Sequence, residues 1–201
     1  MNAEELADSA ELRHRIRRLL AVFRAITIYM QGQGDSREFA QHLAGRVGAI
    51  GRAAIAPIAG GMDLASLVLD ELLVGGVHRT ETVVEGPSVR LNAKASELMS
   101  LVIHELATNA IKFGALSQPQ SRLRVVWWFI GAAAGSRLHF EWAENGVRMA
   151  DAAPHSAGFG SQVVKRLVAS ELRGDGELLL LEEGVLCSIE LPSGEALFSN
   201  E

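Results

Sequence analysis

The chain has 201 residues and a formal net charge of −5, and it is long enough to bury the cores of two modules. The acidic balance excludes a general nucleic-acid-binding protein, because no dominant basic surface is available to displace counterions from phosphates. Residues 1–5 are too acidic for a signal peptide, and no stretch reaches the ~18 apolar residues that a membrane span needs. We therefore expect a cytoplasmic protein without membrane insertion.

The start of the chain predicts a helical hairpin, which we assign to residues 1–60. Over residues 12–30 the apolar residues recur at three- and four-residue steps and form one stripe along a helix. A turn follows at residues 31–34, and Asp35 with Glu38 has the spacing of a capping box that opens a second amphipathic helix. Neither helix can bury its stripe against one partner, so we expect a homodimer with a four-helix bundle, or cover from the neighbouring domain.

Residues 61–193 predict a second module in which helices and strands are interleaved. Asp63 can cap a short helix. Asn92 can cap the longest helix of the module, at about 93–113, and Gly114 would end it.

The remaining elements of this module are predicted from alternation and apolar runs. We expect short extended segments, strands and one more helix, at 82–85, 89–91, 122–130, 136–142, 177–182, 185–191 and, for the helix, 161–172. This order indicates an α/β sandwich whose sheet is covered on one face, and an α+β fold for the whole chain. Residues 194–201 are polar and are expected to form a flexible tail.

One face of the longest predicted helix gathers polar side chains at helical spacing, namely Glu105, Thr108, Asn109 and Lys112. An ordinary solvated helix face has the same spacing. The string His104-Glu-Leu-Ala-Thr-Asn-Ala-Ile-Lys-Phe-Gly114, however, resembles the N box of the histidine kinase and gyrase-type ATPase superfamily. Together with Trp142-Ala143-Glu144, His104 resembles the HWE-type sensor histidine kinases. The resemblance implies an ATP-binding domain of the Bergerat type.

The resemblance also implies a site for ATP and Mg²⁺ on this helix. Asn109 would bind the Mg²⁺ that bridges the ATP phosphates, and Glu105 would act catalytically by polarising or orienting a water of the metal. Mg²⁺ prefers oxygen ligands and keeps several waters, so an amide oxygen with a nearby carboxylate suits it. Lys112, one turn further, can approach the phosphates as a point charge.

By the same resemblance, Glu144 accepts the exocyclic amine of adenine, and Gly146 follows in the turn. The superfamily more often has a second glycine where this chain has Arg148. The segment Gly158-Phe159-Gly160 precedes a predicted helix, whose free N–H groups and dipole suit phosphates. Residues 147–157 would then form a mobile ATP lid.

The first predicted helix carries the string Glu11-Leu12-Arg13-His14-Arg15-Ile16-Arg17-Arg18, which resembles the H box of the family, where a histidine is phosphorylated. His14 lies off the apolar stripe, so its ring is expected to face solvent. A partly unprotonated imidazole can attack the γ-phosphoryl group in line. The usual Lys and Asn of this box are replaced by Arg17 and Arg18, and Glu11 is the candidate general base.

Together these motifs predict a two-component histidine kinase core that autophosphorylates His14 with ATP. The phosphoryl group would pass to an aspartate of a response regulator receiver domain. The alternative is a histidine phosphotransfer or scaffold protein of the same architecture with a degenerate ATP site, which Arg148 and the altered H box favour. A protein-serine kinase, for which His14 would be dispensable, is a third hypothesis. Because no sensor domain fits before residue 11, we expect input from a separate sensor protein, or a stand-alone kinase core.

Overall fold

The structure is a computed structural model, and it describes residues 43–49, 51, 61–74, 80–131, 135–148, 161 and 163–197. The chain divides into two compact units, Met1–Val47 and Gly48–Glu201. Residues 43–49 are helical, within the second amphipathic helix expected from the sequence. Apart from residue 51, which is also helical, the rest of the predicted hairpin lies outside the described residues, so the boundary after residue 60 stays a prediction.

The second unit is built on a five-stranded sheet with the strand order β2-β4-β5-β7-β6. These strands are β2 (Glu81–Glu85), β4 (Arg122–Ile130), β5 (Arg137–Asn145), β6 (Asp175–Leu181) and β7 (Gly184–Pro192). The pair β2–β4 is parallel and the other neighbours are antiparallel. A separate antiparallel pair is formed by β1 (Met62–Asp63) and β3 (Arg90–Leu91). Each predicted extended segment overlaps one of these strands, whereas β1 was not predicted and β5 continues beyond its predicted end at residue 142.

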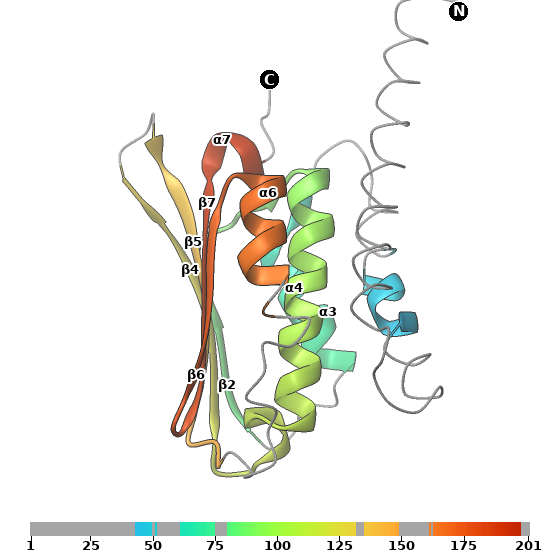
Figure 1. Ribbon diagram of the computed structural model, residues 1–201, viewed down its shortest axis with the longest axis vertical. Coiled ribbons are helices and arrows are strands. Elements are labelled where there is room, and N and C mark those ends of the chain that lie inside the picture. Colours follow the sequence, from blue (N-terminus) through green and yellow to red (C-terminus); the bar gives the residue numbers. More distant parts are fainter. Residues whose placement is uncertain are drawn as a thin grey trace, which may run out of the picture. The chain divides into compact units, whose positions relative to one another are not determined.

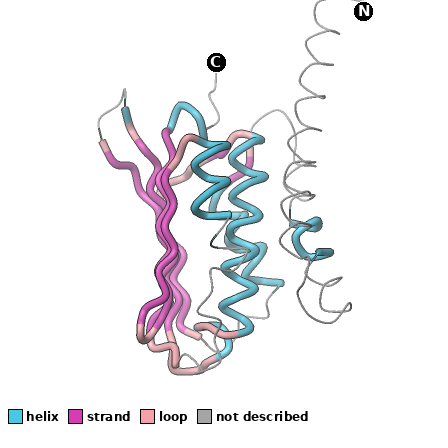
Figure 2. The backbone as a smooth tube through the Cα atoms, in the orientation of Figure 1, coloured by secondary structure: helices cyan, strands magenta, loops and turns pink. Residues whose placement is uncertain are grey.

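Helices α3 (Leu64–Val74), α4 (Ala93–Lys112) and α6 (Val168–Leu172) all lie on one face of the sheet (Figures 1 and 2). The shorter helical segments are the 3₁₀ turn η1 (Ala115–Ser117), the π-helix η3 (Val163–Leu167) and α7 (Ser193–Ala196). The predicted α+β architecture with a sheet covered on one face is confirmed. In the described part of the chain, no helix is both long and apolar enough to cross a membrane.

Helix α4 begins where its cap predicted. The side chain of Asn92 accepts a hydrogen bond from the Ala95 N–H at 2.9 Å, as an N-cap does. At the other end, the N–H of Gly114 donates to the carbonyls of Asn109 and Ala110, both at 3.1 Å. A Cβ on Gly114 would lie 2.0 Å from Oε2 of Glu144. The glycine is therefore required because the Glu144 carboxylate approaches the end of α4 closely.

Strand β5 alternates between the two faces of the sheet. Leu138, Phe140 and Trp142 have no exposed surface, and Glu144, which is 2% exposed, continues the same row on the helix-covered face. A carboxylate thus stands at the end of a row of apolar core side chains. Such burial is costly unless hydrogen bonds compensate for the lost water.

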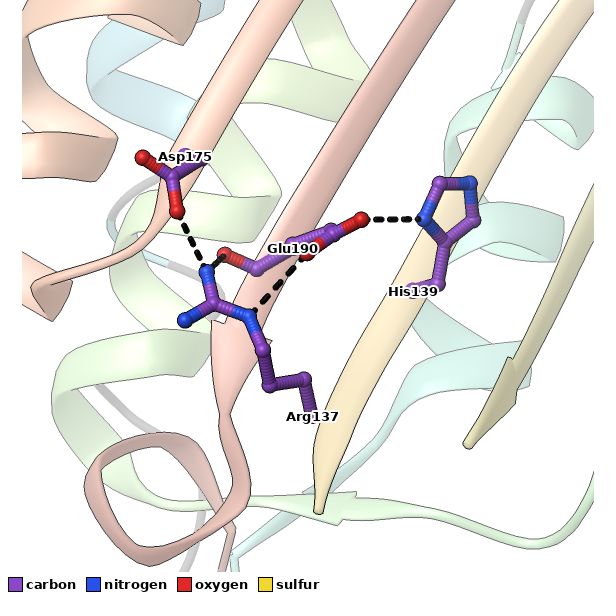
Figure 3. A network of polar contacts seen from close by, with 4 residues as sticks. All are labelled: Arg137, His139, Asp175 and Glu190. Carbon is purple, nitrogen blue, oxygen red and sulfur yellow. Dashed lines mark hydrogen bonds and ion pairs between the residues drawn. The ribbon is translucent and has the colours of Figure 1, made fainter. Parts of the chain in front are cut away.

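The opposite face of the sheet carries a polar network across β5, β7 and β6, which Figure 3 shows. Arg137 donates to Asp175 at 2.5 Å and to Glu190 at 3.1 Å. Nδ1 of His139 lies 3.4 Å from Oε1 of Glu190. The ring of Trp128 packs on His139, with centroids 4.2 Å apart. Ion pairs in such a partly exposed place contribute roughly 0–1 kcal/mol each.

Residues 194–197, at the start of the predicted flexible tail, are attached to the residues around Asn92. Ala196 has no exposed surface, and its carbonyl accepts a hydrogen bond from the Asn92 N–H at 2.9 Å. The side-chain amide of Asn92 donates to the carbonyl of Glu195 at 2.8 Å. Because main-chain carbonyls make most of this attachment, the polar side chains of the segment gave no sign of it.

Candidate active site

The structure describes five of the eight predicted site residues. Three of them, Glu105, Asn109 and Lys112, lie on α4, while Glu144 ends the core-facing row of β5 and Gly146 follows that strand. His14, Gly158 and Gly160 lie outside the described residues, so the phosphoacceptor and the glycines before the predicted helix stay predictions.

The polar face predicted on α4 is divided between the core and the surface. Asn109 and Lys112 are exposed in the last turn, whereas Glu105, one turn earlier, is 7% exposed. The reason is that α4 contacts α3, η3, α6 and α7 besides its sheet side, so residues 95–103 are buried on every side of the helix. Among the described residues, the exposed positions of α4 are Ala93 at its start and Asn109, Ile111 and Lys112 in its last turn. Within the described ranges, no group of three or more His, Cys, Asp or Glu side chains could hold a metal ion.

The carboxylate of Glu144 is held beside the carboxyl-terminal end of α4 by two N–H groups. Its Oε2 accepts from the main-chain N–H of Ala115 at 2.7 Å, and its Oε1 accepts from the indole N–H of Trp142 at 3.0 Å. Burial raises the pKa of Glu144, and the two N–H groups, Ala115 first, lower it by a smaller amount. Desolvation and hydrogen bonding therefore act in opposite directions on the pKa of this carboxyl group.

The two signature residues of the resemblance, His104 and Trp142, both have carboxylate partners. Nδ1 of His104 lies 2.9 Å from Oε2 of Glu71, which is on α3 and 7% exposed, so this pair joins α3 to α4. Trp142 packs in the core, as expected of a tryptophan, and also binds Glu144. Glu71 was not predicted as a functional residue. The available signal was its spacing, because Glu71 follows the buried residues Leu64 and Val68 at i+7 and i+3 on the same face of α3.

The turn after β5 contains a glycine in a left-handed conformation, and its main chain is held by two hydrogen bonds to one side chain. Gly146 has φ +70°, a left-handed conformation that favours glycine. Two residues later, Oε1 of Gln118 accepts from the Arg148 N–H at 3.0 Å, and Nε2 of Gln118 donates to the Arg148 carbonyl at 3.2 Å. The main chain is thus fixed at the position where the superfamily more often has a second glycine. Gln118 was also missed, because nothing in its local sequence indicates a partner thirty residues away.

Curated relatives of this chain are named as histidine kinases. The blue-light-activated histidine kinase of Rhizobium johnstonii is 32% identical over 198 residues, which cover 96% of this chain and 55% of the relative. Blue-light-activated histidine kinase 1 of Erythrobacter litoralis is 30% identical over 194 residues, covering 92% of this chain and 52% of the relative. The chain therefore spans about half the length of these relatives. No protein-family model matches it.

Solved structures extend the likeness to the fold. The histidine kinase domain of the Erythrobacter litoralis blue-light-activated histidine kinase has a TM-score of 0.59 at 19% identity, over 91% of this chain and 89% of that one. A longer structure of the same protein gives 0.62 at 18% identity, over 96% of this chain and 61% of that one. The fold is that of a histidine kinase domain. The sequence identities above confirm the resemblance to HWE-type histidine kinases that the motifs indicated.

Proposed function

We propose that this chain is a two-component histidine kinase core, which transfers the γ-phosphoryl group of ATP to His14 and then to an aspartate of a response regulator receiver domain. One observation carries the nucleotide part of the proposal. The carboxylate of Glu144 is held by two N–H groups beside the carboxyl-terminal end of α4, where Asn109 and Lys112 are exposed. The similarity to proteins named as histidine kinases supports the rest.

Adenine recognition is proposed to depend on the acceptor capacity of Glu144. Among the described residues, each of its oxygens has one N–H partner, and a carboxylate oxygen can accept about two hydrogen bonds. The exocyclic amine of adenine can donate to the remaining lone pairs. Guanine has a carbonyl oxygen at the same place, which would leave two acceptors facing each other. Because Glu144 is 2% exposed, nucleotide entry must displace groups that cover it.

The last turn of α4 fits a magnesium nucleotide better than a metal held by protein alone. Mg²⁺ is commonly bound through one or two protein oxygens, with phosphates and water supplying the rest, and Asn109 offers one exposed amide oxygen. When bound, the metal would neutralise charge on the β- and γ-phosphates. Lys112 would approach the same phosphates as a point charge, and Glu105 would orient a metal-bound water.

The phosphoryl transfer itself is proposed to use the imidazole of His14 as the nucleophile. A bond forms between a ring nitrogen and the γ-phosphorus while the bond from that phosphorus to the bridging oxygen of ADP breaks. The proton on the other ring nitrogen leaves to a base, for which Glu11 is the candidate. Dimerisation through the predicted hairpin would place the histidine of one copy within reach of an ATP domain, its own or that of its partner.

The proposal is tested by labelling the full chain with γ-labelled ATP and comparing it with His14→Ala and Asn109→Ala. We expect each substitution to abolish the label, and His78→Ala, outside any of the motifs, to retain it. The label should be lost in acid, as phosphohistidine is and phosphoserine is not. Undiminished label in His14→Ala would refute the phosphoacceptor, and acid-stable label would favour a serine kinase. A chain that takes no label and does not bind magnesium nucleotide would be a scaffold.

A further inference from the structure

We propose that Trp142 is the positioning residue for adenine recognition. Its indole N–H holds the Glu144 carboxylate as a hydrogen-bond acceptor, so that Trp142 sets the selectivity for adenine over guanine. The inference rests on the proposed function, in which Glu144 binds the adenine amine. It concerns a side chain that does not itself touch the nucleotide.

The geometry confines the carboxylate on three sides. Trp142 and Glu144 are two residues apart on β5, so both side chains point to the helix-covered face of the sheet. The indole N–H lies 3.0 Å from Oε1, and the N–H of Ala115 lies 2.7 Å from Oε2. Gly114 leaves room for this position, because a Cβ there would lie 2.0 Å from Oε2. With no exposed surface on Trp142, its indole cannot turn to water instead.

The two partners of Glu144 determine which protonation state fits. An indole N–H and a peptide N–H can only donate, so both carboxylate oxygens must accept, which the ionised form does best. Burial opposes ionisation and is the larger effect on the pKa of this carboxyl. Removing one donor therefore shifts the balance further towards the protonated acid.

The protonation state of Glu144 in turn decides which base fits. An ionised carboxylate accepts from the amine of adenine and faces the carbonyl oxygen of guanine with another acceptor. A protonated carboxyl can donate to that carbonyl oxygen, so it tolerates guanine. A phenylalanine at position 142 would keep an aromatic ring in the core, with less volume than tryptophan, but it would supply no N–H. The donor is thus what the tryptophan adds to the site beyond its volume.

The test compares the full chain with Trp142→Phe and with the matched control Trp128→Phe, which makes the same change on the other face of the sheet. Binding of Mg-ATP and Mg-GTP is measured by calorimetry from roughly pH 5 to pH 8. This range begins just above the ordinary pKa of a glutamate and extends upward, the direction in which burial shifts the pKa of Glu144. We expect Trp142→Phe to weaken ATP binding about tenfold and GTP binding far less. The loss of ATP binding on acidification should begin at a higher pH than in the unmodified chain. Trp128→Phe should match the unmodified chain.

The possible results separate three conclusions. Equal weakening of ATP and GTP binding by Trp142→Phe, without a change in the pH profile, would mean that Trp142 only supports the fold, and would overturn the inference. Unchanged ATP and GTP binding would overturn it as well. If the unmodified chain binds neither nucleotide at millimolar concentration, the proposed function itself fails.

A second measurement keeps the inference falsifiable if Trp142→Phe does not fold. The chain has three tryptophans, so their indole N–H resonances can be assigned with single Trp→Phe variants at positions 127 and 128. In the unmodified chain, the Trp142 resonance should shift with pH as Glu144 titrates. In Glu144→Gln, which keeps an acceptor oxygen and removes the titrating group, the shift should disappear. A Trp142 resonance that does not respond to pH in the unmodified chain would overturn the inference.

Discussion

Strand β5 makes polar contacts on both faces of the sheet, and the two sets differ in kind. On the helix-covered face, Glu144 is almost completely buried and is held by two neutral N–H groups. On the other face, Arg137 and His139 form a network of opposite charges with carboxylates that water can reach (Figure 3). Low polarity strengthens the buried hydrogen bonds and makes their loss costly, whereas solvent screens the surface pairs. We therefore expect stability to depend more on the buried set, although it has fewer charges, than on the surface pairs.

The largest effect is expected for Gly114→Val, which places a side chain where the buried carboxylate lies. Its Cβ would lie 2.0 Å from Oε2 of Glu144 and 2.8 Å from the Cα of Ala110, so carboxylate and helix end must both move. Overpacking of this kind costs about 3 kcal/mol. Urea denaturation should show this loss of unfolding free energy, together with loss of Mg-ATP binding. A variant as stable as the unmodified chain would mean that the carboxylate does not occupy this position.

A smaller loss is expected for His104→Phe, which breaks the contact between α3 and α4. The phenyl ring keeps most of the volume but leaves Glu71, 7% exposed, without the histidine at 2.9 Å. Losing one partner of a buried charged group costs roughly 1–3 kcal/mol. The measurement is the denaturation midpoint, with His139→Phe as the control on the open face of the sheet. If both variants lost the same stability, the buried pair and the exposed pair would contribute equally, and the contrast drawn between the two sets of contacts would be wrong.

The third prediction concerns pH and uses Glu144→Gln. Since burial raises the pKa of Glu144 above 4.5 in the folded chain, the folded state binds a proton more readily than the unfolded state does. The contribution of this group to stability is present in full below its unfolded pKa and is lost as pH rises through its folded pKa. Stability of the unmodified chain relative to Glu144→Gln should therefore fall with rising pH across that interval. A difference that is constant with pH, or one that rises, would contradict it.

The smallest effect is expected for Arg137→Ala on the open face. The variant removes contacts to Asp175 and Glu190, but the Asp175 side chain is 82% exposed and the pairs are screened by solvent. We expect a loss within about 1 kcal/mol, and a smaller one at high salt. Denaturation midpoints at low and high ionic strength test both statements. Loss of Mg-ATP binding in this variant would show that the two faces are coupled.

Local signals in the sequence predicted most of the elements and the positions of the motifs. The strand expected at residues 122–130 is β4, and Asn92 and Gly114 mark the ends of α4, because caps and alternation are properties of neighbouring residues. The predicted end of β5 at residue 142 is three residues short. Glu144 looks like a loop residue in sequence, yet it pairs with Leu123 and Val185 within the sheet.

What the sequence could not supply are contacts between residues far apart in the chain. The donors to Glu144, the clamp of Gln118 on Arg148, and the pair of His104 with Glu71 all depend on how the elements pack. The burial of Glu105 is another case, since helical spacing separates an apolar from a polar face only when a helix is covered on one side. His14, Gly158 and Gly160 remain predictions from motifs alone.

Helix α7 is joined by hydrogen bonds to the start of α4, the helix that carries three of the candidate site residues. One residue, Asn92, caps α4 with its side-chain oxygen and binds the carbonyls of Glu195 and Ala196 with its two kinds of N–H. With 20 residues, α4 is about 30 Å long, and its far end carries Asn109 and Lys112. A chain that is truncated before Ser193, or that carries a tag there without a spacer, would therefore lose the hydrogen bonds that hold Asn92 at the start of α4. Expression vectors should keep residues 193–197 intact.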